Sequence, residues 1–193
     1  MLSLLTWAIA AVIVPTAANR PAGVANLEAV AEKLVKQCAG VHEGDLVVVS
    51  GSLRDLELLE DIAVEVRSVG AWPLLVPGTE RLTRRMVEDV PAAFDTSAPG
   101  WEMALGDRAT VTITVEAGDD PALLGSVPLD RIAAREKASR RIAERLLARG
   151  VRQVSLGNGL YPTAALARHF RIGQEQLARI FWDGVNADSD ELR

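Results

Sequence analysis

The alternation of short β-branched runs with amphipathic helical segments is the feature that most constrains this fold. Leu46–Val49 is an apolar run of strand length, and the segment Leu27–Cys38 before it carries apolar residues at helical spacing. The same unit recurs, with strands predicted at Trp72–Val76, Ala109–Val115 and Val151–Leu156 and a long helix at about 129–149. Strands that alternate with such helices form right-handed crossovers. The sequence therefore predicts one doubly wound, Rossmann-like α/β domain with a mainly parallel sheet of about four to five strands.

Local signals predict several details of this domain. Asn26 can cap the first helix, whose apolar face comprises Leu27, Val30, Ala31, Leu34 and Cys38. On that face Cys38 would be an inert, packed thiol. The run Leu46–Val49 is typical of a strand buried on both faces. The segment Asp95–Asp107 should be the least ordered, because three residues interrupt any period there: Pro99, Gly100 and Gly106.

The first residues have a composition unlike that of the domain. An apolar run at Leu2–Val14 precedes Pro15 and small residues, which indicates a cleaved signal peptide at 1–18. The run is too short for a membrane span, which needs about 20 apolar residues. No basic residue precedes Arg20, so an uncleaved anchor or a misassigned start remain alternatives. Residues 19–25 would form the mature extension, and 26–193 the α/β domain. Cleavage predicts export to the periplasm or beyond, with no membrane contact afterwards, and otherwise the protein would be cytoplasmic.

Charge and cysteine content exclude several classes of function. The net charge of −5 and the pI near 5.1 argue against a nucleic-acid-binding surface. A basic run lies on and after the long helix, at Arg131, Arg135, Lys137, Arg140, Arg141, Arg145, Arg149 and Arg152. These side chains lie mostly opposite the apolar stripe, as on a solvated face. The single cysteine excludes an intrachain disulfide and a zinc site built from several thiolates.

Turns at the ends of predicted strands are the candidate binding sites. Ser50-Gly51-Ser52 could hold an anion, but the favoured reading is a turn capped by Ser52 with Asp55 in a variant capping box. Gly157-Asn158-Gly159 indicates a turn with positive φ. Glu116, Asp119 and Asp120 follow the third strand, where open α/β folds bind ligands, although Asp120-Pro121 is also a common helix start.

The sequence offers little for catalysis by itself. Its two histidines, His42 and His169, are predicted in a loop and at a surface helix end, without a second ligand at metal-binding spacing. It has no GxSxG nucleophile elbow and no nucleotide-binding glycine motif. We therefore assign no catalytic, cofactor-binding or metal-ligating residue.

Several motifs follow one another from Leu27 to the chain end: Leu27/Ala31/Leu34/Val35, Gly44–Ser52, Gly70-Ala71 with Pro73, Asp107–Ile113, Pro128–Ala134, Tyr161-Pro162-Thr163, the Trp182 segment and Asp188. In this order and spacing the chain resembles the N-terminal domain of thermophilic-type metallo-aminopeptidases, the M29 peptidase family. That family releases N-terminal amino acids from peptides with two divalent metal ions (zinc, cobalt or manganese). Glu, His and Asp side chains of a second, C-terminal domain hold these ions, and no position here corresponds to them.

The resemblance implies a supporting role for this chain and no activity by itself. It would cover an active site carried by a C-terminal catalytic domain and restrict access to peptides. Its partner would be that domain or another copy in a homo-oligomer, since Leu177, Ile180, Phe181 and Trp182 lie close together on the predicted last helix. The alternative is a non-enzymatic exported α/β module that binds a partner protein or a small ligand. A third possibility is a stand-alone enzyme with an unrecognised site.

Overall fold

Four parallel strands form the sheet in a computed structural model that describes residues 26–97, 100–116 and 123–187. The strands are β1 (Leu46–Ser52), β2 (Trp72–Gly78), β3 (Val111–Val115) and β4 (Arg152–Leu156). Their order is β2-β1-β3-β4, so the chain winds outward in both directions from β1. The predicted doubly wound, parallel α/β fold is confirmed. The segments 1–18 and 19–25 lie outside the described residues.

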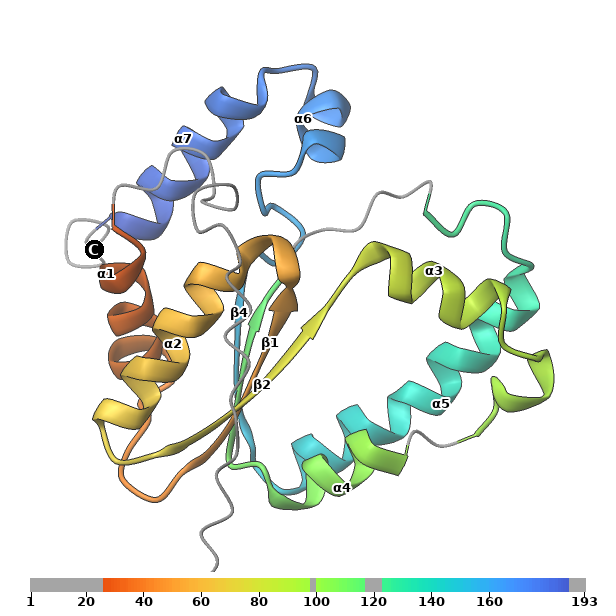
Figure 1. Cartoon of the computed structure of the whole chain (residues 1–193), viewed down its shortest axis with the longest axis horizontal. Helices are drawn as coiled ribbons and strands as arrows, with labels where there is room; N and C mark the ends of the chain where they lie inside the picture. The colour runs from red at the N-terminus through yellow and green to blue at the C-terminus, as the bar shows by residue number, and fades with distance from the viewer. Residues whose placement is uncertain (1–25, 98–99, 117–122, 188–193) are drawn as a thin grey trace, which may run out of the picture.

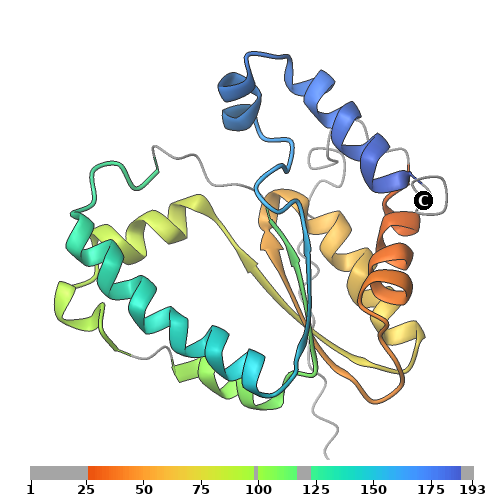
Figure 2. The ribbon, with the colours of Figure 1, turned by 180° about the vertical axis from the view of Figure 1, so that it is seen from behind.

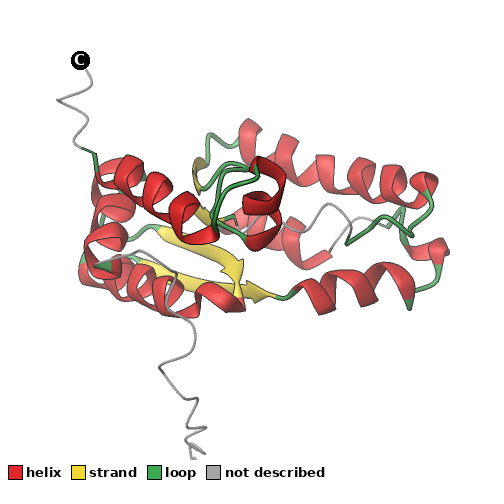
Figure 3. Ribbon diagram, turned by 90° about the horizontal axis from the view of Figure 1, so that it is seen from above, coloured by secondary structure: helices red, strands yellow, loops and turns green. Residues whose placement is uncertain are grey.

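Helices lie on both sides of the sheet (Figure 1; Figure 3). One side carries α1 (Leu27–Glu32), its π-helical continuation η1 (Lys33–Cys38), α2 (Leu56–Ser68) and α7 (Gln174–Asn186). The other side carries α3 (Glu80–Glu88), α4 (Gly100–Arg108) and α5 (Leu129–Ala148). The short elements are η2 (Leu53–Asp55), η3 (Ala92–Phe94) and α6 (Ala164–Phe170). Figure 2 shows α6 beyond the carboxyl end of the strands, and α7 running from there to the side of α1.

The buried core lies between the sheet and the layer of α1 and α2. Alternate strand residues point into it, and Val47, Val49, Val111 and Ile113 are at most 1% exposed. Leu75 and Val154, also predicted for the central sheet, are partly buried against this core. These strand residues are buried because side chains alternate along a strand, so that every second residue faces α1 and α2.

The prediction that β1 is buried on both faces is wrong. Leu46 is 39% exposed, and Val48 is only half-buried. Both point to the side of α3, α4 and α5, and no residue of these helices belongs to the core cluster of the described part of the chain. A valine-rich run indicates a strand, but it does not determine how closely helices pack on its second face.

Cys38 is exposed, so its prediction as a packed thiol is wrong. The first helix changes from α to π at Lys33, and the Ala39 amide donates to the Leu34 carbonyl at 2.8 Å. This wider turn shifts the helical phase, with the result that Val35 and Ala39 point into the core. The Asn26 cap is confirmed, because its Oδ1 accepts from the Ala29 amide at 3.1 Å.

The expectation of irregular structure at Asp95–Asp107 is also wrong for most of that segment. Gly100–Arg108 is helical, and Asp95 is 5% exposed. Arg131 and Arg135 of α5 hold the Asp95 carboxylate at 2.6 and 3.3 Å, a tertiary contact that no local pattern predicts. Within the described ranges, none of the helices combines the length and the apolarity needed to cross a membrane.

Candidate functional site

The carboxyl ends of β1 and β3 lie side by side, where the order of a doubly wound sheet reverses. Ligands of open α/β folds bind at this point. Gly51, the penultimate residue of β1, lies in close contact with its neighbours, since a Cβ there would lie 3.0 Å from Leu59 Cδ2 and 3.1 Å from Val115 Cβ. Beside it, the hydroxyls of Ser50 and Thr114 hydrogen-bond at 3.1 Å. Glycine at position 51 therefore lets α2 and β3 approach.

The segment 157–163 lies at this edge and meets it through one buried polar pair. Tyr161 donates its phenol to Asp55 Oδ1 at 2.8 Å, and the two residues are 2% and 1% exposed. Burial raises the pKa of the Asp55 carboxyl, and the hydrogen bond from Tyr161 and the nearby Arg54 charge only partly oppose the rise. Burial also raises the pKa of Tyr161, which therefore stays protonated and donates. The pair joins the start of α2 to the segment that leads into α6.

Asp55 is the residue whose role sequence reasoning assigned wrongly. Ser52 accepts from the Arg54 amide at 3.2 Å, so its predicted capping role is confirmed. The variant capping box is wrong, because Asp55 makes no capping hydrogen bond and points to Tyr161 instead. Its Oδ2 has no hydrogen-bond partner among the described residues, although Arg54 Nη2 lies 3.6 Å away.

Aromatic rings of α7 complete the surroundings of Tyr161. The Tyr161 ring centroid lies 5.4 Å from that of Phe181 and 5.9 Å from that of Trp182, both edge to face. Trp182 is 1% exposed and Leu177 is 7% exposed, whereas Ile180 is 59% exposed. Of the apolar residues predicted to lie together on the last helix, Ile180 is thus exposed, Phe181 is half-buried, and Leu177 and Trp182 are buried. This chain covers most of that surface itself.

The turn at 157–159 follows the sequence prediction closely. The φ angles of Gly157, Asn158 and Gly159 are 118°, 45° and 78°, all positive. A Cβ on Gly157 would lie 2.7 Å from the Glu116 carbonyl oxygen, so only glycine fits there. Glu116 itself follows β3 as predicted. Asp119 and Asp120 lie outside the described residues, and the acidic cluster stays a prediction.

A second polar cluster lies at the opposite, amino-terminal end of the sheet. Arg152 on β4 contacts Asp45 Oδ2 at 2.5 Å and donates to the Gly40 carbonyl. Burial by itself raises the pKa of Asp45, but hydrogen bonds from the His42 amide, the Thr110 hydroxyl and Arg152 outweigh it and hold the pKa at about 2. His42 is exposed, as predicted, with Nδ1 2.9 Å from Asp45 Oδ2. This cluster fastens the loop before β1 to β4.

A divalent metal does not fit the residues that the structure describes. His42 lies in the loop before β1, whereas His169 is exposed on α6. Across residues 26–97, 100–116 and 123–187, the His, Cys, Asp and Glu side chains form no group of three or more that could hold a metal ion. A catalytic zinc site needs about three convergent protein ligands.

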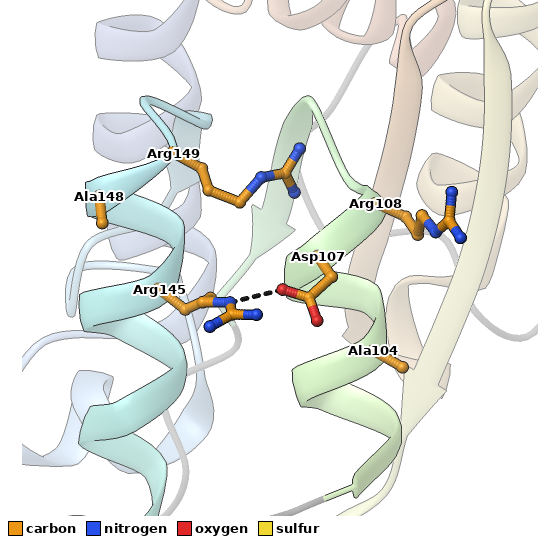
Figure 4. Close-up of a pocket in the computed structure, with 6 residues that line it drawn as sticks. All are labelled: Ala104, Asp107, Arg108, Arg145, Ala148 and Arg149. Atoms are coloured by element: carbon orange, nitrogen blue, oxygen red, sulfur yellow. Dashed lines mark hydrogen bonds and ion pairs between the residues drawn. The ribbon is translucent and has the colours of Figure 1, made fainter.

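The basic face of α5 is partly used for internal contacts. A pocket of about 680 Å³ lies between α4 and α5, lined by Ala104, Asp107, Arg108, Arg145, Ala148 and Arg149 (Figure 4). Arg145 Nε lies 2.5 Å from Asp107 Oδ1, and Arg149 Nη1 donates to the Gly106 carbonyl at 2.6 Å. Two helices end here, and cations stabilise helix C-termini. Local helix ends therefore explain these arginines better than an anion ligand does.

The predicted solvated face of α5 is accordingly correct only in part. Arg131 and Arg135 turn inward to Asp95, with side chains 17% and 30% exposed. Lys137, Arg140 and Arg141 are exposed. An apolar cavity of about 200 Å³ separates this layer from the sheet, lined by Val48, Ser50, Val76, Glu102, Leu105, Gly106, Ala109, Thr112, Ile142 and Leu146.

Comparison with known proteins agrees with this architecture. The solved structure of wild-type AmpT from Thermus thermophilus superposes with a TM-score of 0.62 at 19% sequence identity. The match covers 82% of this chain and 42% of AmpT, so the chain spans less than half of that protein. No curated protein matches. The family model for thermophilic metalloproteases (M29) matches residues 24–188, and this chain therefore belongs to the M29 family.

Proposed function

We propose that this chain acts as the N-terminal domain of a metal-dependent aminopeptidase and supports an active site carried by a metal-binding domain elsewhere. The observation that carries the proposal is the M29 match over 24–188, together with a described region whose acids and histidines do not converge. Peptide hydrolysis of this type uses metal ions to polarise the carbonyl and to activate water. Among the described residues, no group of side chains could hold such a metal ion.

The contacts of the described polar residues support a structural role. Asp55 holds Tyr161, Asp45 holds Arg152, and Asp95 holds two arginines of α5. Each pair links elements far apart in sequence and so fixes the shape of the domain. A rigid domain of this kind can cover an active-site cavity and limit entry to peptides. Peptides would then be substrates of the complete enzyme, and zinc, cobalt or manganese would belong to the other domain.

The test compares the chain alone with the chain isolated from its source cells. Recombinant protein is incubated with zinc, cobalt or manganese and a fluorogenic leucine amide, and its metal content is measured after dialysis. We expect no turnover and no stoichiometric metal. Tagged protein purified gently from the source organism should carry hydrolysis that a chelator removes and added metal restores. Turnover by the recombinant chain, or source material without chelator-sensitive activity, would refute the proposal.

A further inference from the structure

The two sides of the sheet are packed very differently. The core cluster of the described residues includes α1, α2 and α7 but no side chain from α3, α4 or α5. Helix α5 is 20 residues long, yet only Ala138 in it is buried. Helices α3 and α4 likewise contain a single buried residue each, Val87 and Gly106. The described residues therefore pack only loosely on this side of the sheet.

A contiguous apolar surface results on β1 and β2, which we name the open sheet face. It consists of Leu46, Val48, Trp72, Leu74 and Val76. The parallel register places Leu46 beside Trp72 and Val48 beside Leu74, so these side chains share one face. Trp72, Leu74 and Val76 are 57%, 45% and 43% exposed. Exposed apolar residues scattered singly need no explanation, but a contiguous patch of them marks an interaction site.

The shape of the surface favours docking through side chains. The cavity of about 200 Å³ beside Val48 and Val76 has Leu105, Ile142 and Leu146 on its helical side, so it can accept apolar groups. Strand addition at the β2 edge is unfavourable, because Pro73 and Pro77 lack amide donors. An occupant would therefore lie on the face of the sheet.

We infer that the open sheet face is the surface on which the metal-binding domain of the M29 enzyme docks, an inference that rests on the proposed function. The match to this fold covers 42% of the AmpT chain, so more than half of AmpT lies outside the matched region. At the carboxyl edge, Tyr161 and Trp182 are already buried by contacts within this chain. On the α1 and α2 side, the strand residues Val47, Val49, Val111 and Ile113 are already buried in the core cluster. The open sheet face is an exposed apolar surface whose contiguity follows from the strand register, and it is available to a second domain.

Photo-crosslinking in the source organism tests this inference on the full chain. p-Benzoylphenylalanine is placed at Leu74, in the centre of the open sheet face, and in a matched variant at Val64, an apolar residue of α2 that is 66% exposed. Both side chains reach solvent, so both variants should melt at the wild-type temperature. After irradiation, mass spectrometry identifies the crosslinked peptides. We expect adducts from Leu74 to peptides of an M29 metal-binding domain, and none from Val64.

Every other result overturns the inference in a recognisable way. Adducts to that domain from Val64 alone would place the partner on the other side and leave the proposed function intact. Adducts from Leu74 to another copy of this chain would make the face a homodimer contact. Adducts to a protein without metal ligands would refute both the inference and the proposed function. No adduct at Leu74 in a folded, expressed variant would show that nothing docks there.

Discussion

The hydrogen bond between Tyr161 and Asp55 should stabilise the domain measurably. Tyr161→Phe removes the phenol that donates at 2.8 Å to a carboxylate 1% exposed, and it changes little else in shape. A typical intramolecular hydrogen bond contributes about 0.5–1.5 kcal/mol, and a buried acceptor left without a donor costs about 1–3 kcal/mol. We therefore expect a loss of about 2 kcal/mol.

A double-mutant cycle separates this bond from other effects. Asp55→Leu alone leaves the buried Tyr161 hydroxyl without its acceptor and should cost about 1–3 kcal/mol. Combining it with Tyr161→Phe removes both partners, so the combined loss should fall short of the sum by at least about 1 kcal/mol. Urea unfolding followed by circular dichroism measures the four proteins, and a 2 kcal/mol loss moves the midpoint by about 1 M.

The pH dependence gives an independent check of the same pair. The folded pKa of Asp55 is raised above the unfolded value of about 4. Its contribution to stability is therefore complete below pH 4 and is lost as the pH rises through the folded pKa. Relative to the double variant, wild type should lose stability across that window. Additive single losses, or a pH-independent difference, would refute this account of the pair.

Three further outcomes follow from the packing. Leu58→Ala, at a site with 0% exposure, should lower the free energy of unfolding in urea by about 2–5 kcal/mol. The control Leu129→Ala, at 82% exposure, should change it by no more than about 0.5 kcal/mol. Equal losses would contradict the assigned core. Asp45→Asn should destabilise at neutral pH, and its difference from wild type should shrink as the pH falls from about 4 through 2, because the folded pKa is about 2; a difference that is undiminished at pH 2 would oppose this. Cys38 should react fully with Ellman's reagent in the native state, and a protected thiol would restore the packed assignment.

The alternation of strand and helix periods was sufficient to predict the sheet and its parallel direction. Crossover handedness and strand spacing leave few other topologies for such a pattern. Two helix caps were also predicted correctly, since Asn26 and Ser52 each accept a hydrogen bond from a nearby backbone amide. These features depend on residues close in sequence, which is why the sequence alone determined them.

Tertiary contacts decided the features that sequence reasoning got wrong. The prediction for Cys38 assumed 3.6 residues per turn throughout the first helix. Because Lys33–Cys38 is π-helical, that assumption placed Cys38 on the buried face by mistake. Asp55 was predicted to take part in a helix cap, because its actual partner Tyr161 lies 106 residues away in the sequence. Asp95 was predicted to lie in an irregular segment, because the sequence does not show that two arginines of α5 form ion pairs with it. The exposure of Leu74 and Val76 depends on how far α4 and α5 stand from the sheet, a distance that is set by packing between elements and that no local pattern encodes.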